Sequence, residues 1–219
     1  GRYPLLNFQR FLFLFIIFCL STGILNSQIS LKIQGTGEQP YIKEGFRTSI
    51  SKVYIGTNEE DTCSETCNLG ESPSDVVIEF STTITSCAEM FIGLTNILEV
   101  NLNSFDASQV NDMNSMFKGC SNLKSINFGN INTHLVTNME RLCEDCYLLE
   151  SIDLSNLDIS KVTKIDFIFS NCKALTSINF GTSASTVNLE GMMGAFNHCE
   201  NLKTIDLTPF NTDKVTDMK

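Results

Sequence analysis

The pair Cys143 and Cys146, separated by Glu and Asp, forms a C-x-x-C motif. Two thiols at this spacing can exchange a disulfide, or can hold zinc when two further ligands complete a tetrahedron. The sequence contains no second C-x-x-C motif, and its two histidines, His134 and His198, are far apart and have no ligand-type neighbour at close spacing. We therefore favour two thiols packed in a core over a redox or zinc site.

Cys63 and Cys67 lie in a different context, a polar and acidic stretch that begins at Asn58. Disulfides persist in chains that leave the reducing cytosol. We expect a bridge between these two cysteines, or from one of them to another part of the same region.

A regular series of side-chain oxygens could bind a hard cation such as calcium. The series occupies one position in each of five similar segments: Asn101, Asn127, Asp153, Asn179 and Asp206. Its two carboxylates, Asp153 and Asp206, are two segments apart, which is too far to share one ion. We favour a solvated polar face. With no nucleophile, metalloprotease or phosphate-loop motif either, we predict no catalytic, cofactor or metal site.

These residues belong to a repeat of about 26 residues. Leu94 and the four cysteines that follow it in register are separated by 26, 26, 26 and 27 residues. The four cysteines are Cys120, Cys146, Cys172 and Cys199. They form a column of equivalent positions, for which we favour free buried thiols over bridges, because equivalent side chains in a stack point in parallel.

Each repeat combines two periodicities. Val110, Met113, Met116, Phe117 and Cys120 have the spacing of one helix face, which Asp106 or Ser108 could cap. Alternation in the stretch that follows each cysteine indicates a short strand with one buried face. The sequence thus predicts an α/β solenoid of the leucine-rich-repeat type, with parallel strands and short helices, preceded by a small β cap.

The stretch from Phe105 to Leu123, FDASQVNDMNSMFKGCSNL, resembles the BspA-like leucine-rich-repeat surface proteins, whose units read FDTSxVTDMSxMFxGCxxL. The ending FNTDKVTDM is similar to the same unit, and the resemblance covers Ile84 to Lys219. It implies display on a cell surface and adhesion to host or matrix proteins, with no shared catalytic residues. The chain departs from the unit at Leu94, Cys143, Ile165 and Leu189, all apolar replacements.

The N-terminus has the features of a secretory signal peptide, assigned to residues 1–27. Ten apolar residues, FLFLFIIFCL, follow Arg2 and Arg10 and precede small and polar residues. Ten residues span about 15 Å as a helix, half of a bilayer's hydrocarbon core, which disfavours a membrane anchor. Removing the two arginines changes the net charge from −10 to −12, and an acidic chain argues against nucleic-acid binding.

Residues 28–83 lack the repeat and contain three alternating stretches, at 29–33, 52–55 and 76–80. We interpret this region as a β-rich cap for the first repeat; an independent domain is the alternative, although about 55 residues make a marginal core. Residues 84–219 form the repeats. Met218 corresponds to Met113, so we expect the natural chain to continue past Lys219.

The leading hypothesis is a secreted or cell-surface, non-catalytic protein-interaction module that binds a protein partner and touches a membrane only through its signal peptide or an unseen C-terminal anchor. Its candidate face is the set of exposed strand positions: Glu99, Asn101, Ser125, Asn127, Ser151, Asp153, Ser177, Asn179, Thr204 and Asp206. The alternatives are the ectodomain of a larger receptor or enzyme, and a structural coat protein.

Overall fold

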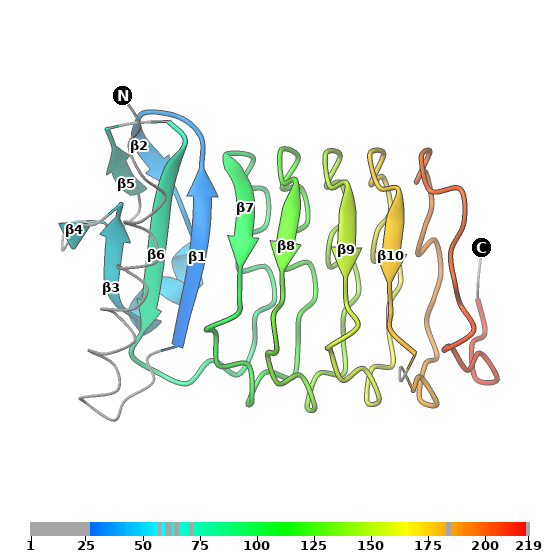
Figure 1. The fold of residues 1–219 in the computed structure, drawn as a ribbon. Coiled ribbons are helices and arrows are strands. Elements are labelled where there is room, and N and C mark those ends of the chain that lie inside the picture. The colour runs from blue at the N-terminus through cyan, green and yellow to red at the C-terminus, as the bar shows by residue number, and fades with distance from the viewer. Residues whose placement is uncertain are drawn as a thin grey trace.

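The structure is a computed structural model that describes residues 27–56, 58–59, 63, 66–70, 72–182 and 185–217. All but the last residue of the predicted signal peptide lies outside these ranges. The elements, in chain order (Figure 1), are β1 (Ser27–Ile33), β2 (Gly37–Pro40), the 3-10 helix η1 (Glu44–Ser49), β3 (Ile50–Ile55), β4 (Asn58–Glu59), β5 (Thr66–Leu69), β6 (Ser74–Phe80), β7 (Ile97–Asn101), β8 (Ser125–Asn127), β9 (Ser151–Asp153) and β10 (Ser177–Asn179).

The N-terminal region is an antiparallel sheet that continues into the repeats. The strand order is β4-β3-β6-β1-β7-β8. Strand β1 pairs antiparallel with β6 on one side and with β7 on the other. Its alternate residues Ile29, Leu31 and Ile33 are buried. The three stretches whose alternation predicts strands lie in β1, β3 and β6. Because β7 belongs to the first repeat, β1 joins the two regions by a ladder of backbone hydrogen bonds.

The repeats follow one another as units that lie side by side (Figure 1). Strand β7 pairs in parallel with β8, and β9 pairs in parallel with β10. On the other side of each unit, isolated parallel bridges link equivalent residues one unit apart. They run Ser86–Asp112–Asn138–Lys164–Gly191–Asp217.

The expectation of a helix-containing α/β leucine-rich-repeat solenoid is wrong. Among the described residues the structure contains no α-helix; η1, in the N-terminal region, is the one helical segment there. The strands form small sheets of mixed direction, one with six strands and two with two. The segments predicted as helices, including residues 110–120, contain turns and a bridge residue, here Asp112, and no helix.

The reason is a backbone that enters the left-handed region twice in each of these segments. In the second unit Ser115 has φ 54° and Gly119 has φ 74°, values that a right-handed helix excludes. The N–H groups of Ser115 and Phe117 donate to carbonyls of the next unit, at 2.9 Å in each case. The N–H groups of Met116 and Cys120 donate instead to carbonyls three residues back in their own unit. Successive tight turns therefore produce the three- and four-residue spacing that indicated a helix.

One hydrophobic core extends through both regions. It begins with β1 and continues unit by unit to Ala195. Phe91 and Phe117, equivalent residues of neighbouring units, stack with ring centroids 5.6 Å apart and planes 7° from parallel. Repeated positions thus pack on their own equivalents, which ties the core to the period of the sequence.

Candidate functional site: the polar strand face and its adjoining turns

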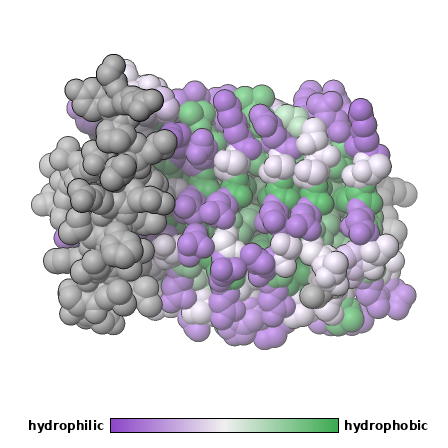
Figure 2. Space-filling model, in the orientation of Figure 1, coloured by the Kyte–Doolittle hydropathy of each residue, from purple (hydrophilic) through white to green (hydrophobic). Residues whose placement is uncertain are grey.

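All ten residues of the predicted interaction face are exposed. Eight of them lie in β7, β8, β9 and β10, where the residue between each pair points inward. The prediction that Thr204 and Asp206 are strand positions is wrong, because the backbone there forms no strand. Figure 2 shows hydrophilic and near-neutral side chains over these strands, with apolar side chains between them.

The side-chain oxygens that suggested a cation site are engaged in turns. Each accepts the backbone N–H of the residue two positions on: Asn101 from Asn103 (3.0 Å), Asn127 from Gly129 (3.0 Å), Asp153 from Ser155 (2.9 Å), Asn179 from Gly181 (3.0 Å) and Asp206 from Thr208 (2.9 Å). This is the Asx turn, in which a short polar side chain replaces a backbone acceptor. The series therefore shapes the corner at which each strand ends.

Amide groups also link this series across units. Asn127 donates from Nδ2 to Oδ1 of Asn101 at 3.2 Å, and Asn179 donates to Oδ1 of Asp153 at 3.1 Å. Hydrogen bonds from the Ser155 side chain and backbone lower the pKa of Asp153. Among the described residues, no group of three His, Cys, Asp or Glu side chains is placed to hold a metal ion.

A second series of Asx turns stands where helix caps were predicted. Its acceptors receive N–H groups from two residues on: Asp106 from Ser108 (3.0 Å), Asn132 from His134 (3.2 Å), Asp158 from Ser160 (3.0 Å) and Asn211 from Asp213 (2.9 Å). The helix-cap prediction is wrong because no helix follows. A polar side chain at the same place in each unit was the signal, and it indicates a turn equally well.

The cysteine column makes a third regular series. Each thiol lies 3.1 Å from, and donates to, a backbone carbonyl of the preceding unit: Cys120 to Phe91, Cys146 to Phe117, Cys172 to Cys143 and Cys199 to Phe169. All four cysteines are free, and so is Cys143. Cys199 is only half-buried, which corrects its prediction as a buried residue; within the described residues, no further cysteine-bearing turn covers it.

Burial makes these thiols poor nucleophiles. Desolvation raises the pKa of Cys120, Cys143, Cys146 and Cys172 above the usual thiol value. Because the thiolate is the reactive form, burial disfavours the reactive form of both cysteines in the C-x-x-C motif.

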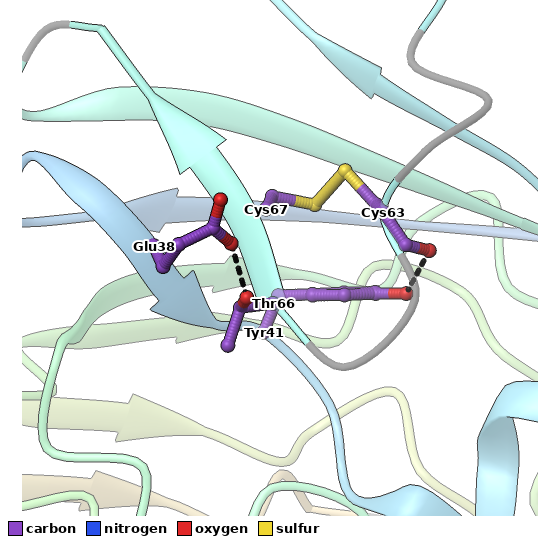
Figure 3. Close-up of a disulfide and its surroundings, with 5 residues drawn as sticks. All are labelled: Glu38, Tyr41, Cys63, Thr66 and Cys67. Carbon is purple, nitrogen blue, oxygen red and sulfur yellow. Dashed lines mark hydrogen bonds between the residues drawn. A yellow bond between two sulfur atoms is a disulfide. The ribbon is translucent and has the colours of Figure 1, made fainter.

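Cys63 and Cys67 form a disulfide at the start of β5 (Figure 3). The Cys63 carbonyl accepts a hydrogen bond from the hydroxyl of the buried Tyr41 at 3.2 Å. The hydroxyl of Thr66 donates to the carboxylate of Glu38 on the neighbouring strand β2. The bridge thus fixes the small β2–β5 sheet.

An ion cluster lies on the turns of the third unit. Glu144 accepts from Lys118 and from Arg141, each at 2.8 Å. Burial opposes ionisation of this carboxyl, but the two cations outweigh burial and lower the pKa of Glu144. The Arg141 guanidinium also lies 4.5 Å from the ring centroid of Phe167. Both Arg141 and Phe167 have left-handed backbones, with φ of 56° and 55°.

Four exposed large apolar side chains were missed by the sequence reasoning: Val187 (50% exposed), Met193 (37% exposed), Tyr147 and Leu148. Tyr147 and Leu148, in the turn before β9, are 41% and 42% exposed. The sequence offered a signal for Tyr147 and Leu148, because polar residues, Ser121 and Asn122, occupy the equivalent positions of the preceding unit. His198 is exposed, and His134 is half-buried with its Nδ1 2.8 Å from Oδ1 of Asn132.

No helix in the described part of the chain is long and apolar enough to cross a membrane. No curated protein and no solved structure gives a significant match to the chain. Residues 85–193, just under half of the chain, match a family model described as "Mycoplasma protein of unknown function, DUF285". This match supports a relationship to BspA-related repeat proteins at the level of the family.

Proposed function

We propose that the chain is a non-catalytic protein-interaction module, secreted or displayed on a cell surface, with an adhesive role. The observation that carries the proposal is the exposed polar face of β7 to β10, on which each strand places exposed polar side chains at the same two positions. Turns anchored by Asx hydrogen bonds hold these positions in register. A face built in this way can meet a large partner without prior ordering, which lowers the entropic cost of binding.

We also propose that the units belong to the specific BspA-like type that the stretch Phe105–Leu123 resembles. The family match to residues 85–193 supports the broader relationship. The two left-handed turn positions give a physical reason for a residue of that motif. The glycine before the cysteine in that motif, Gly119 here, has φ 74°, a conformation that glycine adopts without steric cost.

Adhesion is tested with the full chain, secreted from its own N-terminus and coated on beads. We expect the chain in the medium and saturable attachment of the beads to fibronectin, laminin or collagen. Retention of the chain inside the cell, or attachment to none of these proteins, would contradict the secreted and adhesive parts of the proposal.

The face is tested with Ser125→Lys, Ser151→Lys and Ser177→Lys together. These side chains are exposed and carry no turn, unlike Asn127 or Asp153, so the fold should remain intact. We expect attachment to fall by about tenfold, or about 1.4 kcal/mol. The matched control is Glu190→Lys, an exposed position on the turn side of the units, which should leave attachment unchanged.

A further inference from the structure

The Cys63–Cys67 bridge can be approached by a reagent from one side. Cys63 is half-buried, whereas its partner Cys67 is buried in β5. The two cysteines are four residues apart in the chain. Because so short a loop is already compact in an unfolded chain, the fold adds little to the proximity of the two sulfurs. A bridge of this kind is reduced more readily than one that closes a long loop in a buried core.

A backbone carbonyl connects the bridge to the buried part of the N-terminal region. The hydroxyl of Tyr41 donates to the carbonyl of Cys63 at 3.2 Å, and the Tyr41 side chain is buried. Figure 3 shows this side chain reaching from the end of β2 to that carbonyl. Loss of a hydrogen bond at a buried hydroxyl is costly, because water cannot readily replace the acceptor. The bridge, which holds Cys63, therefore also influences the position of Tyr41.

Tyr41 lies in the segment that attaches the N-terminal region to the first repeat. The carbonyl of Pro40, the residue before it, accepts a hydrogen bond from the Asn96 side chain at 2.6 Å. Two residues after it, the N–H of Lys43 donates to the carbonyl of Met90 at 3.0 Å. Asn96 and Met90 belong to the first unit. The bridge is therefore connected, through one buried side chain, to two contacts between the N-terminal region and the repeats.

A second attachment between the same two regions does not involve the bridge. Residues 30–33 of β1 pair antiparallel with β7, the strand of the first unit. Strand β6 pairs with the other edge of β1 and holds it in the six-stranded sheet. Opening of the disulfide should therefore release the attachment at residues 40–43 and leave the attachment through β1 in place.

We infer that the Cys63–Cys67 bridge is a redox-sensitive clamp. A thiol reductant opens the bridge and thereby loosens residues 40–43 from the first repeat, while β1 stays paired with β7. The inference goes beyond the proposed adhesion and holds whatever the repeats bind.

The clamp opens by thiol–disulfide exchange. A thiolate of the reductant attacks Sγ of Cys63, the bond between the two sulfurs breaks, and its electron pair leaves on Sγ of Cys67. A second reductant thiolate then attacks the reductant sulfur of the mixed disulfide and frees Cys63 as a thiolate. Two protons from the two reductant thiols end on the two cysteines. One disulfide of the protein and two thiols thus give two protein thiols and one disulfide of the reductant.

The experiment measures hydrogen exchange at single amides of the secreted full chain by NMR, before and after treatment with reduced glutathione. Alkylation and mass spectrometry establish whether Cys63 and Cys67 have been freed. The readout is the amide of Lys43, and the amides of β1 are the internal control. One variant, Cys63→Ser with Cys67→Ser, holds the clamp open without a reductant. A second variant, Tyr41→Phe, keeps the bridge and removes the hydroxyl.

We expect glutathione to free both cysteines and to speed exchange of the Lys43 amide about tenfold, the factor that loss of one ordinary hydrogen bond gives. The amides of β1 should keep their rates. The double serine variant should show the faster Lys43 rate from the start and should not respond to glutathione. Tyr41→Phe should raise the Lys43 rate while the bridge is intact, and reduction should add little to it.

Other results would overturn the inference. A bridge that resists glutathione until the whole chain unfolds would not be a switch. Reduction that leaves the Lys43 rate unchanged would show that the bridge acts only locally. A Tyr41→Phe variant that behaves as the natural chain would show that the bridge does not act through this side chain. Equal acceleration at Lys43 and in β1 would mean that reduction opens the N-terminal region as a whole.

Discussion

The N-terminal region and the repeats bury their apolar side chains by opposite means. The N-terminal sheet uses strands of up to seven residues, paired antiparallel, with a disulfide beside them. The repeats use strands of three to five residues, paired with one another in parallel, with free thiols inside. Long strands are held by a long ladder of backbone hydrogen bonds to a neighbouring strand, whereas short strands depend on hydrogen-bonded turns at every corner. The difference predicts that the two regions respond differently to the same perturbation.

The largest effect is expected from removing a stacked ring in the repeats. Phe117→Ala deletes a fully buried side chain that packs on Phe91. We expect the free energy of unfolding to fall by about 3–5 kcal/mol, measured by urea denaturation. Lys124→Ala, an exposed position in the same unit, is the control and should change stability little. A loss no larger than that of the control would mean that the units do not share a packed core.

Loss of the disulfide should affect the N-terminal region alone. Cys63→Ser opens a bridge whose partners are four residues apart, and the chain-entropy relation gives a cost of about 2 kcal/mol for so short a loop. Hydrogen exchange should rise in β2 and β5 and remain unchanged in β8 to β10. Faster exchange throughout the repeats would show that the bridge supports the whole molecule.

Alkaline pH should destabilise the repeats rather than the N-terminal sheet. Burial raises the pKa of the Cys146 thiol, so this thiol stays protonated in the folded chain while the unfolded chain ionises it above about pH 8.5. Its stabilising contribution is complete below that pH and is lost as pH rises. Cys146→Ala should reduce the loss of stability by about 1.4 kcal/mol per pH unit. Urea midpoints between about pH 8 and pH 10 measure this slope, and identical slopes for both proteins would contradict it.

The smallest effect is expected at a left-handed turn position. His198 has φ 55°, in the place that Gly119 occupies with φ 74° in the second unit. His198→Gly relieves this steric strain, which should raise the free energy of unfolding by about 0.5–1 kcal/mol. Thermal denaturation measures this gain as a higher midpoint temperature. His134→Gly, at a position without positive φ, should not stabilise the chain. Equal gains at both positions would rule out a conformational origin.

Much of the strand arrangement could be predicted from the sequence, because alternation depends only on which residues are apolar. Ile29, Leu31 and Ile33 mark β1 for this reason, and the regular spacing of Cys120, Cys146 and Cys172 marks the units. The turns could not be predicted. Their left-handed residues include Arg141 and Phe167, whose side chains give no indication of positive φ. A pattern of three- and four-residue spacings fits a helix and a series of turns equally well.

The properties of the candidate site likewise fall into those that the sequence predicts and those that only the structure shows. The exposure of Asn127 and Asp153 follows from their place between apolar residues in a strand. Their role as turn acceptors depends on backbone geometry that only the structure shows. Leu148 could have been singled out from the sequence as an apolar residue where Asn122 and Asn201 stand, but the hydrogen bonds of those two asparagines are visible only in three dimensions.

The parallel bridges and the backbone hydrogen bonds that Ser115 and Phe117 donate run from one unit to the next, along the line of the stack. A pull applied through the two ends of the repeats would therefore load these bonds one row at a time instead of all together. Each row that opens releases a unit of about 26 residues, or about 90 Å of extended chain. Under tension the repeats would lengthen in even steps at modest force and absorb a sudden load as extension.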